Sequence, residues 1–219
     1  MTELEAIRER HSVRVFKDIP FDDATVSALR KAAEECNKEG GMHFQIAVNE
    51  PEAFQANRPN YGSFQKCRNY IALVAPRGKD EQVGYYGEKF VLAAQTLGVN
   101  SCWVALTYKK GKANVQVGAG EKLYMVIALG YGETQGHARK SKTPAEVSDI
   151  DENAPEWYKA GVEAALLAPT AINQQKFRFE RKENSVSAKA GFGVYAKVDL
   201  GIVKYHFEVG AGRENFRWE

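Results

Sequence analysis

Two separated segments carry the side chains best suited to chemistry. The first runs from Arg10 to Arg14 (Arg-His-Ser-Val-Arg) and places a hydroxyl between two guanidinium groups. Planar guanidinium groups match phosphate oxygens better than a mobile ammonium does. The second runs from Ala168 to Gln175 (Ala-Pro-Thr-Ala-Ile-Asn-Gln-Gln), where a small, stiff stretch that can lie flat on an aromatic plane precedes amides that exchange hydrogen bonds with ring atoms. Together the segments predict a site for one phosphorylated, aromatic ligand.

Each of these residues also has a purely structural interpretation. Ser12, Thr170 and Asn173 are residue types that cap helices, because their side chains satisfy unpaired backbone N–H groups. The two arginines can form surface ion pairs, and His11 can either line a ligand or cap a helix. The functional interpretation therefore depends on the presence of both motifs in one chain.

Helices and strands are expected to alternate along the first part of the chain. The residues Phe21-Asp22-Asp23 offer an acidic N-cap for a helix, Gly40-Gly41 ends that helix, and Gly98 ends another. Asp199 is expected to cap the last helix. The predicted elements are helices over 1–10, 24–37, 86–97 and 198–210, and strands over 42–48, 70–75 and 122–129.

The composition is that of an ordinary folded domain. The chain has 219 residues, of which 44% are hydrophobic and 26% charged, enough to bury a sizeable core. The net charge of +2, with acids and bases interspersed, predicts no nucleic-acid partner. The longest apolar runs are far shorter than the roughly 18 residues of a membrane-spanning helix, so no membrane association is expected.

The cysteines and histidines give no pattern typical of a disulfide framework or a metal site. Cys36, Cys67 and Cys102 are odd in number and widely spaced, and the histidines lack metal-ligand spacing. The charged first 20 residues contain no secretory apolar region. We therefore expect a cytoplasmic, reducing location and no metal.

The second half of the chain repeats the first in reduced form. The stretch 32–44 aligns with 164–177, each as a helix, a loop and a short strand, and Gly87 with Gly98 aligns with Gly201 with Gly212. Residues 133–153 are polar and read as a connector. The expected organisation is a first half over 1–132, the connector over 133–153 and a shorter second half over 154–219.

A glycine pattern near the end of the chain matches the dinucleotide-binding fingerprint only weakly. Residues Gly191 to Ala196 fit the spacing of its glycines. Too little chain follows for the remaining strand and the acidic ribose ligand that the fingerprint requires. The segment is therefore interpreted as a glycine-rich turn before the last helix.

These motifs resemble the FMN-dependent nitroreductase family over most of the chain. The resemblance rests on Arg-His-Ser-x-Arg-x-Phe from Arg10, on Ala-Pro-Thr-Ala-x-Asn-Gln-Gln from Ala168, and on Cys102-Trp103 after a helix that ends in glycine. It implies an α+β fold with a central, mainly antiparallel sheet flanked by helices. Two related α/β halves in one chain would mimic the family homodimer.

The resemblance also implies FMN as cofactor. Family members usually take the arginine motif from one subunit and the proline-containing loop from the other. Here the first-half loop, Glu35 to Gly41, lacks the proline, the hydroxyl and the glutamine pair. One chain is therefore expected to hold one complete flavin site between its own halves. The implied cofactor-binding residues are Arg10, His11, Ser12, Arg14, Cys102, Trp103, Val104, Lys140, Lys142, Pro169, Thr170, Ala171, Asn173 and Gln174.

Some of these assignments have open alternatives. Lys140 and Lys142 can contact phosphate or belong to a solvated linker. The segment from Cys102 to Val104 can run beside the flavin or simply begin a buried strand. Cys102 follows a helix C-terminus rather than an N-terminus, so it is not expected to act as a nucleophile.

The activity implied by the resemblance is an oxidoreductase cycle. NAD(P)H would give a hydride to flavin N5, and a flat, electron-poor acceptor such as a nitroaromatic or a quinone would then take it, so no catalytic side chain is required. The expected partners are NAD(P)H and a small aromatic acceptor, in a monomer whose further dimerisation stays open. The alternatives are a non-catalytic flavin-binding protein and a cofactor-free structural descendant.

Overall fold

A computed structural model describes residues 1–55 and 63–219. The described residues form two compact units that are discontinuous in sequence. We call residues 9–79 and 90–138 the sheet unit, and residues 1–8, 80–89 and 139–219 the helix unit. The prediction of two related halves in one chain stays a prediction, and the units are described separately below.

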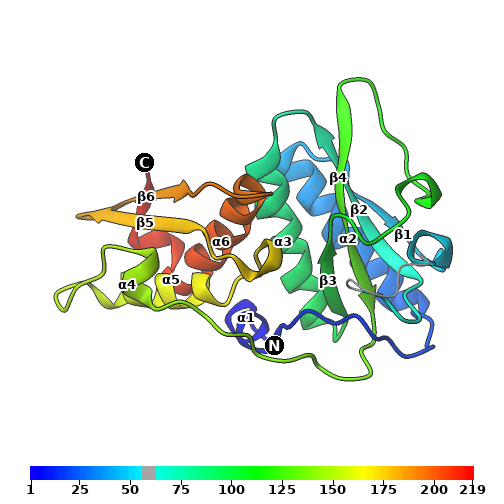
Figure 1. Cartoon of the computed structure of the whole chain (residues 1–219), viewed down its shortest axis with the longest axis horizontal. Helices are drawn as coiled ribbons and strands as arrows, with labels where there is room; N and C mark the ends of the chain where they lie inside the picture. Colours follow the sequence, from blue (N-terminus) through cyan, green and yellow to red (C-terminus); the bar gives the residue numbers. More distant parts are fainter. Residues whose placement is uncertain (56–62) are drawn as a thin grey trace. The chain divides into compact units, whose positions relative to one another are not determined.

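An antiparallel sheet dominates the sheet unit (Figure 1). Its described strands lie in the order β1-β2-β4-β3, and β2 pairs with β4 from Asn69↔Leu129 to Pro76↔Glu121. The apolar run from Tyr70 to Ala75 is completely buried, as expected for a strand covered on both faces. The predicted antiparallel sheet is confirmed. The strands are β1 (Gln45–Ala47), β2 (Asn69–Pro76), β3 (Asn100–Val104) and β4 (Glu121–Gly130).

Helix α2 (Asp23–Gly40) has the caps that its sequence predicts. Asp22 accepts a hydrogen bond of 2.7 Å from the backbone N–H of Thr25, which satisfies one of the free donors of the first turn. Gly41 ends the helix in the left-handed conformation with φ 62°. Because these signals are local, the boundaries lie within a few residues of the expected 24–37.

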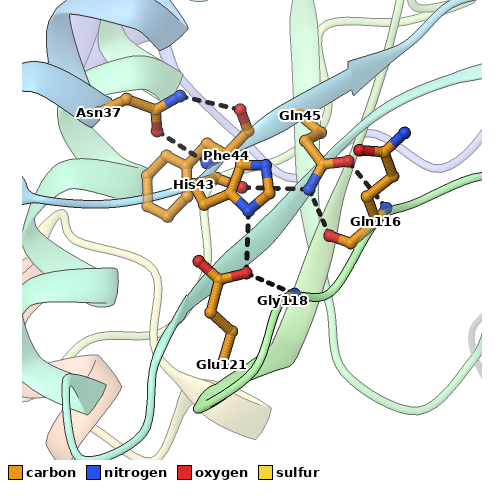
Figure 2. A network of polar contacts seen from close by, with 7 residues as sticks. All are labelled: Asn37, His43, Phe44, Gln45, Gln116, Gly118 and Glu121. Carbon is orange, nitrogen blue, oxygen red and sulfur yellow. Dashed lines mark hydrogen bonds and ion pairs between the residues drawn. The ribbon is translucent and has the colours of Figure 1, made fainter.

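The loop that follows α2 is held by polar contacts to its own neighbourhood (Figure 2). The Asn37 side chain accepts from the Phe44 N–H at 2.7 Å and donates to the Phe44 carbonyl at 3.0 Å. Next to it, His43 Nδ1 lies 2.9 Å from Glu121 Oε2, and the Gln45 amide donates to the Gln116 carbonyl at 2.7 Å. The Asn37 amide near the end of α2 therefore binds the backbone of Phe44 in the following strand region.

The helix unit combines helices with a smaller sheet (Figure 1). Strands β5 and β6 pair antiparallel, and β7 joins β6 in parallel. Phe207 packs against Phe179 with ring centroids 4.7 Å apart and contacts Tyr158 edge-on, which joins the last long helix to this sheet. The elements are α1 (Glu3–Glu9), α3 (Asp80–Thr96, shared with the sheet unit), α4 (Pro144–Val147), α5 (Glu156–Leu166), α6 (Ala196–Ala211), β5 (Phe177–Lys182), β6 (Ser185–Ala190) and β7 (Arg217–Trp218), with 3-10 turns η1 (Pro51–Phe54), η2 (Lys110–Lys112), η3 (Ala171–Asn173) and η4 (Arg213–Asn215).

Within the helix unit, the first turns of α3 approach α6 closely through glycines. A Cβ atom placed on Gly84 would lie 1.9 Å from the Val198 carbonyl oxygen. A Cβ atom on Gly201 would lie 1.9 Å from the Glu81 carbonyl oxygen. The two helices therefore meet backbone to backbone, a distance that only glycine allows.

Two helix starts differ from the sequence expectation. Helix α3 begins at Asp80 rather than near 86, and Lys79 before it makes no side-chain cap. The acids Asp80 and Glu81 instead favour the first turn through the helix dipole. Helix α6 begins at Ala196, after Tyr195 in the left-handed conformation, so the prediction that Asp199 caps this helix is wrong.

The connector and the chain end also contain more structure than expected. Residues Pro144–Val147 form α4. At its N-terminus is a capping box, in which the Glu146 carboxylate accepts from the Thr143 N–H at 2.8 Å. Strands β6 and β7 were not among the elements expected from the sequence, although β6 alternates polar and apolar residues. Within the described ranges, no helix is long and apolar enough to cross a membrane.

Candidate functional site

The arginine motif lies beside an edge strand of the sheet unit. Helix α1 ends at Glu9, so the motif follows this helix rather than forming its end. Ser12 pairs in parallel with Ser101 of β3, and the Val13 N–H donates to the Ser101 carbonyl at 3.0 Å. Since β3 is the last strand in the order β1-β2-β4-β3, its outer edge is available for this pairing. The motif is thereby aligned with the strand that carries Cys102.

The Cys102 thiol is surrounded by the polar groups of this motif. Burial raises the pKa of Cys102, while the positive charge of Arg14, a hydrogen bond with Ser12 and the charge of Arg10 act in the opposite direction. Burial dominates, so the thiol is neutral at neutral pH and is a poor nucleophile. The Ser12 hydroxyl and the charges of both arginines thus act on the same thiol. We call Arg10, Ser12, Arg14 and Cys102 the arginine cluster.

A second segment of the sheet unit covers the motif. Asn100 accepts from the Gly132 N–H at 2.9 Å and donates to the Gln135 side chain at 2.8 Å. The chain then passes so close to the motif that a Cβ on Gly136, which has φ 79°, would lie 2.7 Å from the His11 Cβ. His11 Nδ1 donates to the Glu9 carbonyl at 3.0 Å, the contact expected from its helix-capping alternative.

The chemistry of the arginine cluster suits a phosphate group. Arg10 is buried, with 3% of its surface exposed, whereas Arg14 is exposed. A buried and an exposed guanidinium with a hydroxyl between them can bind phosphate oxygens from two sides. Of the other predicted residues on β3, Trp103 is half-buried and Val104 is part of the buried core.

In the helix unit, the segment Ala168–Gln175, which we call the ring loop, has an unusual backbone. Ile172, Asn173 and Gln175 all have positive φ, at 48°, 56° and 44°. This left-handed region is unfavourable for residues other than glycine, and most of all for a β-branched residue such as Ile172. Such a loop keeps its shape only where surrounding contacts hold it.

Gln175 supplies much of that support. Its side chain is buried, donates to the Leu166 carbonyl at 3.0 Å and to the Ser141 hydroxyl at 3.0 Å, and accepts from the Lys142 N–H at 2.8 Å. The Thr170 hydroxyl accepts from the Gln175 N–H at 3.1 Å. Gln175 belongs to the sequence motif, but its structural role could not be read from its residue type.

The connector and the ring loop are joined by further hydrogen bonds. The Asn173 amide donates to the Lys140 carbonyl at 2.8 Å, and the Lys142 ammonium donates to the Gln175 carbonyl at 2.8 Å. Arg139 donates to the carbonyl of Ala168. Within the helix unit, the structure thus brings Lys140 and Lys142 of the connector together with the ring loop. The Lys140 side chain is exposed, and its contact with phosphate stays a prediction.

Asp199 is a residue of this region that the sequence did not reveal. Its carboxylate is 4% exposed and accepts from the Ala171 N–H at 3.0 and 3.1 Å and from the Gln174 amide at 2.7 Å. The same amide nitrogen donates to the Val194 carbonyl at 2.9 Å. Both amide hydrogens of Gln174 are therefore used within the protein, and only its oxygen can serve a ligand. The available signal in the sequence was an acidic residue inside a helix of mostly apolar residues.

Burial raises the pKa of Asp199 from an ordinary 3.8 to about 6, against the effect of the hydrogen bonds from Gln174 and Ala171. A raised pKa means that the folded state holds this proton more tightly than the unfolded state does. The stabilisation linked to this proton is complete below about pH 4 and is lost as the pH rises through about 6. The change corresponds to about 3 kcal/mol.

We therefore expect a pH-dependent difference between the wild-type protein and Asp199→Asn. The excess unfolding free energy of the wild type should fall by up to about 3 kcal/mol between pH 4 and pH 7, because Asn does not titrate. Urea unfolding of both proteins over this range measures it, and other groups cancel in the comparison. A difference that stays constant with pH would contradict the raised pKa.

Comparison with known proteins identifies the family of this chain. A family model described as "Putative TM nitroreductase" matches residues 3–211, almost the whole sequence. The chain belongs to this nitroreductase family. No curated protein matches the sequence significantly. The family match covers the arginine cluster and the ring loop alike, as the resemblance drawn from the motifs predicts.

Solved structures of nitroreductases share the fold. A "putative nitroreductase" from Thermotoga maritima is 22% identical, with a TM-score of 0.70, and the match covers 98% of this chain and 85% of that chain. A "putative nitroreductase" from Desulfovibrio desulfuricans, solved in complex with FMN, is 17% identical, with a TM-score of 0.55, and covers 71% of this chain and 99% of that chain. These likenesses confirm the predicted nitroreductase-like α+β fold.

Proposed function

We propose that this nitroreductase is an FMN-dependent oxidoreductase that passes a hydride from NAD(P)H through flavin N5 to a flat, electron-poor acceptor such as a nitroaromatic or a quinone. The observation that carries the proposal is the pairing of Ser12 with Ser101, which sets the arginine motif along the strand that carries Cys102. Membership of the nitroreductase family and a fold neighbour solved with FMN support the same cofactor.

The residues present fit FMN in their chemistry. The phosphate of FMN is a dianion, and the arginine cluster offers charge-assisted donors for it. The isoalloxazine ring needs a flat surface, and Pro169 is buried while Thr170 and Ala171 are half-buried with small side chains. Each unit thus carries groups suited to one part of the cofactor.

The mechanism asks little of the protein beyond placement and electrostatics. Bound FMN supplies the hydride-accepting chemistry at N5. Arg10, Ser12 and Arg14 would bind the phosphate and the polar tail, while Pro169 to Ala171 would orient the ring. Because the amide hydrogens of Gln174 are occupied, the ring loop is proposed to offer its surface and its carbonyl and amide oxygens rather than this side-chain donor.

The proposal is tested by the visible absorbance of the purified protein before and after incubation with FMN and gel filtration, followed by anaerobic addition of NADH or NADPH. We expect about one retained flavin per chain that bleaches on reduction and is reoxidised by a quinone. Retained flavin that does not bleach would indicate a non-catalytic flavin-binding protein. A colourless protein would indicate a cofactor-free descendant of the family.

Arg14→Ala should weaken FMN binding strongly. The change removes a charge-assisted phosphate contact worth roughly 1.5 to 3 kcal/mol, so the FMN dissociation constant should rise about ten- to hundredfold. Quenching of flavin fluorescence on binding measures this constant. Arg14→Lys keeps the charge but loses the paired geometry of the guanidinium. Its FMN dissociation constant should lie between those of the wild type and Arg14→Ala.

Arg30→Ala is a matched control for the arginine substitution. Arg30 is also an exposed arginine of the sheet unit, but it lies on α2 and outside the arginine cluster. Its removal changes the net charge equally and should leave FMN affinity within about twofold. Equal affinities for the Arg14 and Arg30 variants would refute the phosphate assignment.

A further inference from the structure

The carboxylate of Asp199 is placed against the ring loop rather than against solvent. Helix α6 starts after Tyr195, and Asp199 lies within its first turn with 4% of its surface exposed. An ionised carboxylate in such a place needs several hydrogen-bond donors to offset the loss of water. Among the described residues, its hydrogen-bond donors are the Ala171 N–H and the Gln174 amide, and both belong to the ring loop.

These contacts enclose the strained part of the loop. Ala171 lies directly before the left-handed residue Ile172, and Gln174 follows the left-handed residue Asn173. Asp199 therefore fixes the backbone on one side of the turn and a side chain on the other. Without an acceptor at this position, the N–H of the half-buried Ala171 would lose its partner and the turn could relax.

We propose that Asp199 is a positioning residue for the cofactor, and that it forms a latch with Gln174 which holds the ring loop in the shape that FMN requires. This inference rests on the proposed function, because it assumes that the ring loop contacts the flavin. Asp199 itself acts only through Ala171 and Gln174.

The latch extends to a second loop of the helix unit. The Gln174 amide also donates to the Val194 carbonyl, and a Cβ on Gly193 would lie 2.4 Å from its side-chain oxygen. This second loop carries Phe192, which is 99% exposed, while the ring loop carries Ile172 at 83%. One amide side chain thus fixes two loops that each present an apolar side chain to solvent.

The experiment compares FMN dissociation constants, measured by fluorescence quenching, with the melting temperatures of the cofactor-free proteins. Asp199→Asn keeps the side-chain shape and one acceptor oxygen, but it turns amide hydrogens toward those of Gln174. Asp199→Ala removes both acceptors. We expect the dissociation constant to rise at least tenfold in the Asn variant and further in the Ala variant.

Asp149→Asn is the matched control, because Asp149 is a carboxylate of the same unit that accepts from the Tyr158 hydroxyl at 2.6 Å and from the Arg181 N–H at 2.9 Å. Its substitution should lower the melting temperature and leave FMN affinity within about twofold. If the Asp199 variants behave like this control, Asp199 is merely structural and the inference is wrong. A wild-type protein that binds no FMN would instead overturn the proposed function itself.

A double-mutant cycle with Gln174→Leu tests the latch independently and does not depend on Asp199 variants alone. If the two side chains act as one unit, the double variant should bind FMN about as weakly as the weaker single variant. Effects that simply multiply would show that the two residues act separately, and the latch would be refuted.

Discussion

Replacing Gly201 with alanine should lower the free energy of unfolding by at least about 3 kcal/mol, a large effect for one methyl group. The new Cβ would lie 1.9 Å from the Glu81 carbonyl oxygen and 2.6 Å from the Tyr85 nitrogen, and both are backbone atoms that cannot rotate away. Helices α3 and α6 would have to separate, which opens the packing between them. An ordinary glycine-to-alanine change inside a helix would instead stabilise it by about 1 kcal/mol.

Gly111→Ala is the natural control for this substitution, because no atom lies within 4 Å of a Cβ at Gly111 and its φ is not left-handed. It should change the unfolding free energy by less than about 0.5 kcal/mol. Urea unfolding followed by circular dichroism measures both variants. Wild-type or higher stability in Gly201→Ala would mean that α3 and α6 do not touch at this glycine.

Replacing Glu88 with leucine should also destabilise the protein strongly. His206 Nδ1 donates to the Ala164 carbonyl at 3.0 Å, because a carbonyl oxygen can only accept. The other ring nitrogen, Nε2, lies 2.8 Å from Glu88 Oε1. Both side chains are completely buried. Removing one member of such a pair leaves the other in an apolar interior without its partner, which costs about 3 to 5 kcal/mol.

The double variant Glu88→Leu with His206→Phe separates a broken pair from a lost pair. Replacing both members with apolar side chains removes the unmatched imidazole, and the Ala164 carbonyl keeps the Leu167 N–H as its donor, so most of the lost stability should return. Chemical unfolding of the single and double variants gives the comparison. A double variant that is less stable than Glu88→Leu would show that the pair itself, rather than its completeness, stabilises the helix unit.

The elements predicted correctly are those whose signals are local. The Asp22 cap and Gly41 set the ends of α2, and the apolar run of β2 gives a fully buried strand. The start of α3 was placed late because its first turn relies on acids and tertiary contacts rather than on a capping residue. Tertiary packing decided the boundary there, and one residue's type does not show it.

The candidate site shows the same division. The motifs supply the residue types proposed for the site, and within each unit several of these residues lie close together. What the sequence could not show is which donors and acceptors the protein uses itself. Gln174 is predicted to contact the ring, and its amide nitrogen donates to Asp199 and Val194, while Asp199 was expected to cap a helix and does not. Residue type determines the capacity for hydrogen bonds, but the fold determines the partners.

The helix unit combines residues 1–8 with residues 139–219, so segments far apart in sequence must meet before this unit can fold. Within this unit Glu3 of α1 accepts a hydrogen bond from Tyr205 of α6, 202 positions later in the sequence. Contacts between residues so far apart in sequence form slowly, because a long loop must close first. The apolar side chains of α1, Ala6 and Ile7, therefore lack their final neighbours until the distant segments of this unit have come together. The helix unit should therefore fold more slowly than a unit of similar size built from one continuous segment.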